Sequence, residues 1–260
     1  MPEIARAASD EELVITADDD HGIVTMRLNR PQRLNALSES LVGALEEALA
    51  GAVAERRRAV ILTGTGRAFS AGFDLREERD DDGVRQIDAQ QRLGETLATM
   101  PVPVIAAVNG LAIGGGCEIA LACDVVLSAS DAVFGLPEVR VGTAMGGGTS
   151  FLLARAVGRL RASYFVLLGE PIGAVEAHSF GMVSEVVDGA ELPSAAFSLA
   201  TKFASRPPYA IAAVKAAMRR GLDQPFAEAL RAEREEIHAT QFHPESAALI
   251  DRFRADSTYD

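Results

Sequence analysis

The sequence predicts an α/β fold, because short apolar runs alternate along the chain with helical segments. Residues 59–63 and 101–108 have the composition of buried strands, and residues 84–100 between them are helical. Strands that alternate with helices imply a sheet with crossover connections. From about Leu192 the pattern is helical to the end of the chain. We therefore expect a core over residues 1–190 and a helical region over residues 191–260.

The other elements are expected in chain order around this framework. Residues 13–16 and 23–28 alternate on either side of an Asp-rich turn, a pattern typical of a β-hairpin. Residues 37–56 are helical, and Ser38 is placed to cap that helix. The remaining expectations are a glycine-rich loop at 64–75, a solvated charge run at 76–83, strands at 125–128 and 132–134, glycine-punctuated segments at 141–157, 160–169 and 174–181, and an apolar run at 183–187.

Composition and charge exclude several classes of protein. The chain has 260 residues, 48% hydrophobic and 24% charged, which is enough for a substantial core. It has no apolar run of the roughly 20 residues that span a bilayer, and its N-terminus lacks a signal-peptide pattern, so we expect a cytoplasmic protein that does not enter a membrane. A net charge of −12 with only two lysines argues against a nucleic-acid partner.

The cysteines and histidines do not indicate a disulfide or a metal site. Cys117 and Cys123 fall on different faces of an expected helix, which favours two free thiols. His238 and His243 lie five residues apart and have no third ligand candidate nearby, which argues against a metal.

The most informative motif is Asn-Gly-Leu-Ala-Ile-Gly-Gly-Gly-Cys-Glu at residues 109–118. Glycines such as Gly114 and Gly115 let a ligand approach the backbone N–H groups closely. Because residues 119–122 are helical, those N–H groups would lie at a helix N-terminus, where partial positive charge gathers. Such a site can hold a developing oxyanion, with the carboxyl of Glu118 one turn away.

A second glycine-rich loop and a second acid accompany this motif. The loop at 64–75 lacks the endings of a phosphate loop, a dinucleotide site or a nucleophile elbow, so it offers exposed backbone. Phe-Gly-Leu-Pro-Glu at 134–138 places Glu138 after a short strand. Glu118 and Glu138 in one apolar pocket could perform acid–base chemistry. Equally, they could offset a helix dipole and cap a helix, and spacing alone leaves both interpretations open.

Four segments in this order and spacing resemble the crotonase superfamily, the enoyl-CoA hydratase/isomerase family. They are residues 28–37, 67–75, 109–118 and 134–142, within a match over about 13–187. The resemblance implies a β-β-α spiral core with a C-terminal helical trimerisation region. It also implies a homotrimer or a homohexamer built as a dimer of trimers.

The resemblance further implies the roles of individual residues. The thioester oxygen of an acyl-CoA would accept hydrogen bonds from the backbone N–H groups of Phe73 and Gly115. Glu118 would orient or deprotonate water, and Glu138 would exchange a proton at C2. Because both acids are present, the implied reaction is reversible syn hydration of a 2-enoyl-CoA to a 3-hydroxyacyl-CoA, with CoA arriving in the substrate and no other cofactor. The implied substrate and CoA contacts are Arg33, Ala68, Ser70, Ala71, Gly72, Asp74, Leu75, Arg76, Gly114 and Lys215.

The sequence also departs from the family pattern. Met145 and Leu152 stand where hydratases usually carry a proline and an arginine beside the acyl pocket, and the tail around residues 246–254 only loosely resembles the usual basic ending. Double-bond isomerisation or hydrolysis of a C–C or thioester bond is the nearest alternative. An RNA-binding protein and a catalytically silent scaffold are remote ones, since the charge opposes the first and the two acids oppose the second.

Overall fold

The computed structural model describes residues 12–74 and 84–255, and the chain divides into two compact units after Ser205. The division falls later than the expected boundary at residue 190. The reason is that helix α7 (Leu192–Ala204) packs on strands of the first unit's sheet and buries Leu192, Ala196 and Ala200 there.

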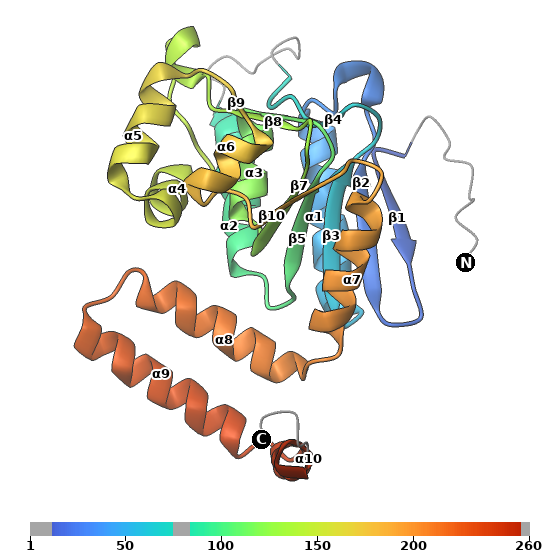
Figure 1. Cartoon of the computed structure of the whole chain (residues 1–260), viewed down its shortest axis with the longest axis vertical. Coiled ribbons are helices and arrows are strands. Elements are labelled where there is room, and N and C mark those ends of the chain that lie inside the picture. The colour runs from blue at the N-terminus through green and yellow to red at the C-terminus, as the bar shows by residue number, and fades with distance from the viewer. Residues whose placement is uncertain (1–11, 75–83, 256–260) are drawn as a thin grey trace. The chain divides into compact units, whose positions relative to one another are not determined.

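The first unit contains a six-stranded sheet with the order β1-β2-β3-β5-β7-β10. Only β1 is antiparallel to its neighbour, so the predicted hairpin is confirmed, and the other pairs are parallel. Both β3 and β5 are buried along their whole length, as expected for parallel strands covered on both faces. The strands are β1 (Val14–Asp18), β2 (Ile23–Leu28), β3 (Ala59–Gly64), β5 (Val104–Val108), β7 (Val125–Ala129) and β10 (Glu185–Val187) (Figure 1).

A second, four-stranded sheet has the order β4-β6-β8-β9. It consists of β4 (Ala68–Ser70), β6 (Leu111–Ile113), β8 (Val133–Gly135) and β9 (Ile172–Gly173). The sequence patterns predict a loop where β4 lies and do not predict β6, because strands of three residues are too short to show a period. The parallel pairing of β4 with β6 brings the two glycine-rich motifs side by side.

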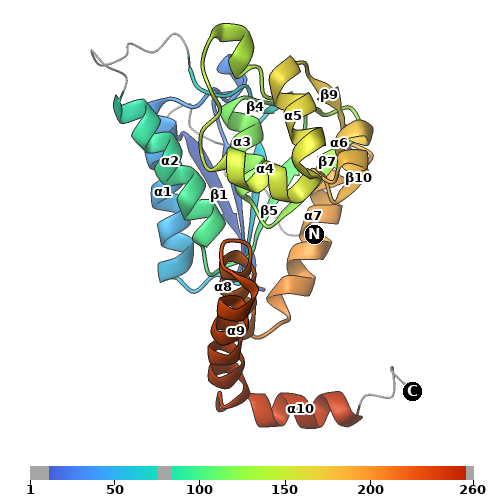
Figure 2. The same cartoon turned by 90° about the vertical axis from the view of Figure 1, so that its left-hand side faces the viewer.

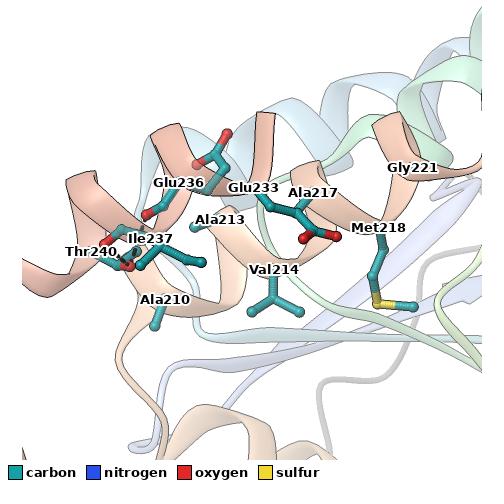
Figure 3. Close-up of a pocket in the computed structure, with 10 residues that line it drawn as sticks. All are labelled: Ala210, Ala213, Val214, Ala217, Met218, Gly221, Glu233, Glu236, Ile237 and Thr240. Atoms are coloured by element: carbon teal, nitrogen blue, oxygen red, sulfur yellow. Dashed lines mark hydrogen bonds between the residues drawn. The ribbon is translucent and has the colours of Figure 1, made fainter. Parts of the chain in front are cut away.

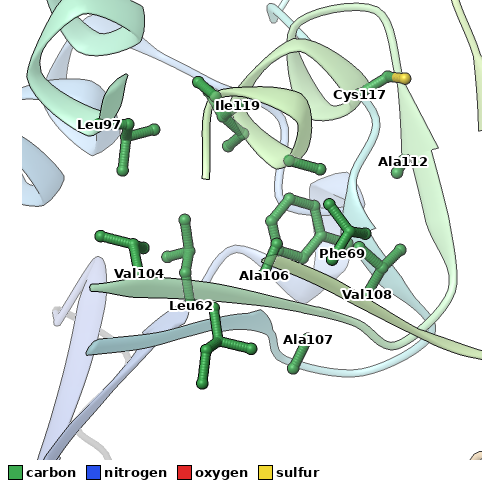
Figure 4. Close-up of a cluster of buried hydrophobic side chains, with 14 of the residues drawn as sticks. Leu62, Phe69, Leu97, Val104, Ala106, Ala107, Val108, Ala112, Cys117 and Ile119 are labelled. Carbon is green, nitrogen blue, oxygen red and sulfur yellow. The ribbon is translucent and has the colours of Figure 1, made fainter. Parts of the chain in front are cut away.

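Helices cover both faces of the larger sheet, with α1 and α2 on one side and α7 on the other (Figure 2). The Ser38 hydroxyl caps α1 (Glu39–Ala54) by accepting from Leu41 N at 3.1 Å, as predicted. Between α2 (Val84–Thr99), α3 (Gly115–Ala122) and the strands, Leu97 and Ile119 pack over Leu62 and Val104 (Figure 4). The other helices of this unit are η1 (Pro31–Arg33), η2 (Glu138–Val141), α4 (Thr149–Val157), α5 (Arg159–Leu168) and α6 (Ala174–Phe180).

The second unit is helical and consists of α8 (Pro208–Gly221), α9 (Phe226–Gln241) and α10 (Ser246–Ala255). Helices α8 and α9 pack along each other and leave a groove of about 330 Å³, with Met218 on one wall and Ile237 on the other (Figure 3). Tyr209 of α8 contacts the segment where α10 begins. Its hydroxyl lies 2.9 Å from Ser246 Oγ, and its ring stacks on His243. Across the described residues, no helix combines the length and apolar character that a bilayer crossing requires.

Glycine at position 116 allows α3 to approach β4, and this contact can be tested. A Cβ on Gly116 would overlap the Ser70 carbonyl, so we expect Gly116→Ala to lower the free energy of unfolding by about 1–3 kcal/mol. Gly43 lies inside α1, where a Cβ would meet no described atom within 4 Å, and Gly43→Ala should raise stability by about 0.5–1 kcal/mol. Urea denaturation measures both, and equal effects would contradict the proposed close approach.

Candidate active site

The two glycine-rich motifs meet backbone to backbone. Gly72 has a φ of +85°, and a Cβ there would lie 2.6 Å from Ile113 O and 3.1 Å from Gly115 N. A side chain at position 72 would therefore be strained and would push the segments apart. The ring of Phe73 covers Gly115 from the other side, since a Cβ on Gly115 would lie 2.5 Å from it.

This contact leaves two N–H groups available at adjacent points of the backbone. Leu37 forms a parallel bridge with Phe73, in which Leu37 N donates to Gly72 O at 2.8 Å and Asp74 N donates to Leu37 O at 3.1 Å. In such a bridge the N–H of the middle residue points to the opposite side, so the Phe73 N–H points away from Leu37. The Gly115 N–H begins α3 and has no acceptor within the helix.

Buried polar side chains hold the first of these loops in place. Ser70 Oγ donates to Asn35 O at 2.8 Å and accepts from Gly72 N at 3.2 Å. Asn35 Nδ2 donates to Ala68 O at 2.7 Å, and Arg30 forms an ion pair of 3.0 Å with the buried Asp74 carboxylate. Ser70 and Asp74 therefore shape the loop through their side chains.

Glu118 lies in the first turn of α3 and is 1% exposed. Its Oε1 accepts from Gly146 N at 2.7 Å, and its Oε2 accepts from Gln90 Nε2. Burial raises the pKa of Glu118 above its usual value, and these two hydrogen bonds act in the opposite direction. Both oxygens of this carboxyl are thus held by N–H donors.

Glu138 begins η2 and faces the same glycine backbone. Its Oε1 lies 3.0 Å from where a Cβ on Gly114 would be, and its Oε2 is buried with no hydrogen-bond partner among the described residues. Burial raises the pKa of Glu138, a hydrogen bond from its own backbone acts in the opposite direction, and the charge of Glu118 raises the pKa again. Burial, and after it the charges of these two carboxyls, raises the pKa of the Cys117 thiol, which disfavours its reactive thiolate form.

These observations describe two carboxyls beside paired backbone donors, and the comparisons with known proteins identify the family. The sequence profile described as enoyl-CoA hydratase/isomerase matches residues 18–254. The chain belongs to this family.

Individual members of the enoyl-CoA hydratase/isomerase family resemble the chain over most of its length. A probable enoyl-CoA hydratase of Rhizobium meliloti is 39% identical over 95% of this chain and 98% of its own. A 1,2-epoxyphenylacetyl-CoA isomerase of Escherichia coli is 35% identical over 76% of this chain and 79% of its own. The crystal structure of an enoyl-CoA hydratase from Bacillus anthracis has a TM-score of 0.90 at 32% identity, covering 94% of this chain and 96% of that one. The predicted crotonase fold and enzyme class are confirmed.

Within this family fold, the other residues expected to contact substrate lie in several places. Arg33 is exposed on η1, and Lys215 lies on α8 of the second unit. The Ala71 N–H donates to Leu34 O at 2.9 Å, and the Gly114 N–H donates to Gly135 O at 2.8 Å. Leu75 and Arg76 lie outside the described residues.

Sequence reasoning missed two groups that hold Glu118. Gln90 lies on α2, where a glutamine among polar neighbours gives no signal of a role. Gly146 belongs to the glycine run at 146–148, whose pattern marks only a break between segments. The described part of the chain contains no group of three or more His, Cys, Asp or Glu residues that could hold a metal ion.

The buried carboxyl of Glu138 predicts a pH-dependent stability difference. Its pKa in the folded state is raised above the ordinary 4.5. Between pH 4.5 and this folded-state pKa, the folded state therefore binds more protons than the unfolded state. The free energy of unfolding therefore loses this contribution as pH rises through the folded-state pKa. Because glutamine cannot ionise, Glu138→Gln should gain stability relative to the wild type as pH rises.

Urea denaturation across the pH range checks this expectation. Glu47 is exposed on α1, and Glu47→Gln serves as the matched control. Stability curves of Glu138→Gln and the wild type that run parallel in pH would contradict the prediction.

Proposed function

We propose that the chain catalyses the reversible syn hydration of a 2-enoyl-CoA to a 3-hydroxyacyl-CoA. The observation that carries this proposal is the unequal setting of two carboxyls at one glycine-rich backbone. Glu118 is hydrogen-bonded on both oxygens, whereas Glu138 has a buried oxygen without a partner among the described residues. A pair of acids in different environments is suited to giving one proton and accepting another.

The thioester carbonyl oxygen accepts hydrogen bonds from the N–H groups of Phe73 and Gly115. The contact between Gly72 and Gly115, the outward direction of the Phe73 N–H and the helix-start position of Gly115 support this assignment. As the double bond is attacked, negative charge develops on this oxygen. One such donor contributes about 10²–10³ in rate.

The two carboxyls divide the elements of water between C3 and C2. Glu118, whose oxygens accept from Gly146 N and Gln90 Nε2, acts as the base: it orients the water and takes its proton as the oxygen bonds to C3. Glu138, whose pKa is raised by burial and by the charge of Glu118, acts as the acid and delivers a proton to C2. Net addition is one OH and one H, and the acids then re-equilibrate their protons through solvent.

Substrate recognition and subunit assembly complete the proposed function. CoA arrives as part of the substrate, no other cofactor takes part, and the reaction takes place in the cytoplasm. Arg33 supplies a cation for its phosphates, and the contact expected for Lys215 stays a separate prediction from the family resemblance. The second unit mediates assembly into a homotrimer or a homohexamer, and the exposed Met218 and Phe226 on its helices support an interface there.

Purified protein with crotonyl-CoA tests the reaction directly. We expect loss of the absorbance of the conjugated thioester and formation of the 3-hydroxyacyl-CoA. Glu138→Gln should lower kcat by about 10²–10⁴-fold while CoA-ester affinity stays close to that of the wild type. Absence of turnover with enoyl-CoA esters of every chain length, despite binding, would refute hydration.

Isomerisation of an acyl-CoA double bond is the second candidate, because the matching family profile is described as enoyl-CoA hydratase/isomerase. It moves a proton between carbons and adds no water. Incubation with a 3-enoyl-CoA separates the two reactions, since an isomerase converts it to the conjugated 2-enoyl-CoA, whereas a hydratase that acts on 2-enoyl-CoA esters leaves it unchanged.

A further inference from the structure

Helix α2 reaches the candidate catalytic carboxyl through the side chain of Gln90. Gln90 is half-buried, and its Nε2 donates to Glu118 Oε2. The other oxygen, Oε1, accepts from the Gly146 N–H. Donors from two separate elements therefore fix the rotation of the Glu118 carboxyl about its last bond.

Two glycines allow the elements that carry these donors to lie close together. A Cβ on Gly146 would lie 2.5 Å from Gln90 Cδ and 2.9 Å from its Oε1, so the amide rests flat against that glycine. Gly94 lies one turn after Gln90 on the same face of α2, and a Cβ there would overlap the backbone of Gly147. At Gly94 and Gly147, helix α2 and the 146–148 segment thus pack backbone to backbone.

The charges around Glu118 give this arrangement a chemical consequence. Among the described residues, the titratable groups whose charge interacts with Glu118 are Glu138 and the thiol of Cys117, and neither is a cation. The anion of Glu118 is consequently stabilised by two neutral amide donors in an apolar setting. Each oxygen still has a lone pair with which to accept from water.

We propose that Gln90 is a positioning residue for the hydration reaction, which holds the Glu118 carboxylate in the rotation and ionisation state that receives the water proton. This inference rests on the proposed function and adds a residue outside the motifs that the family resemblance supplied. Gln90 acts through Glu118 and does not touch the reacting atoms.

A purely structural role for Gln90 makes different predictions. If Gln90 only filled space against Gly146, an isosteric apolar side chain would change stability and leave the pH profile unchanged. If Gln90 stabilises the anion, its removal raises the pKa of Glu118, because one of the two opposing hydrogen bonds is lost. The acid limb of kcat/KM then moves to higher pH.

The test compares Gln90→Met with Gln91→Met, since Gln91 is the exposed neighbour on the same helix. For Gln90→Met we expect kcat to fall by about 10- to 100-fold with little change in KM, because small displacements of a catalytic group are costly. Its acid limb should lie at higher pH. Gln91→Met should match the wild type in all three, and circular dichroism confirms that both variants fold.

Gly146→Ala supplies an independent route to the same contact. Its backbone lies outside the positive-φ region, so alanine is tolerated there, but the new Cβ displaces the Gln90 amide. Since both changes remove the same hydrogen bond, from Gln90 to Glu118, the double variant should be no slower than Gln90→Met alone. Multiplicative losses in the double variant would overturn the proposal.

A measurement without turnover separates this inference from the proposed function. Titration of [δ-¹³C]glutamate by NMR follows the Glu118 signal, which is assigned by its loss in Glu118→Gln. A higher Glu118 pKa in Gln90→Met supports the positioning role even if no enoyl-CoA is hydrated, in which case only the reaction assignment fails. An unchanged Glu118 pKa with wild-type kcat overturns the role of Gln90.

Discussion

The contact between the 72–73 and 114–115 backbones is the constraint on which the rest of the site depends. It requires glycine at position 72, where φ is +85° and where any side chain would meet Ile113 O. It also requires the pairing of β4 with β6, because that pairing sets the distance between the two loops. The Leu37–Phe73 bridge then fixes the direction of one N–H, and the start of α3 fixes the other.

Placing the two carboxyls beside this contact has a cost in stability. Burial raises the pKa of both Glu118 and Glu138, which means that the fold opposes their ionised forms. For Glu118 the opposition is reduced by two N–H donors. For Glu138 the described residues provide no partner to its buried Oε2, a hydrogen bond from its own backbone acts against burial, and the charge of Glu118 adds to the effect of burial. The two acids therefore differ in the donors that surround them and in the charge that each faces.

The sequence predicted those parts of the molecule that carry a long pattern or a dense motif. The hairpin, the capped helix α1 and the crossover strands β3 and β5 have enough residues for their period or composition to be read. Strands β4 and β6 have three residues each and pair over long sequence separation, so local patterns could not reveal them. Helix α3 begins at Gly115 rather than at residue 119 because glycines weaken any helical signal even where the backbone is helical.

The same limit explains why Glu118 was a candidate while its supporting groups were not. A carboxylate after three glycines is conspicuous in sequence, whereas a hydrogen bond between Gln90 and Glu118 depends on how α2 is rotated about its axis. That rotation is set by tertiary packing: Leu93 and Leu97 are buried in the core, and this turns Gly94 toward Gly147 and Gln90 toward Glu118. The buried side of α2, together with its close packing on Gly147, therefore determines which polar side chain reaches the candidate catalytic carboxyl.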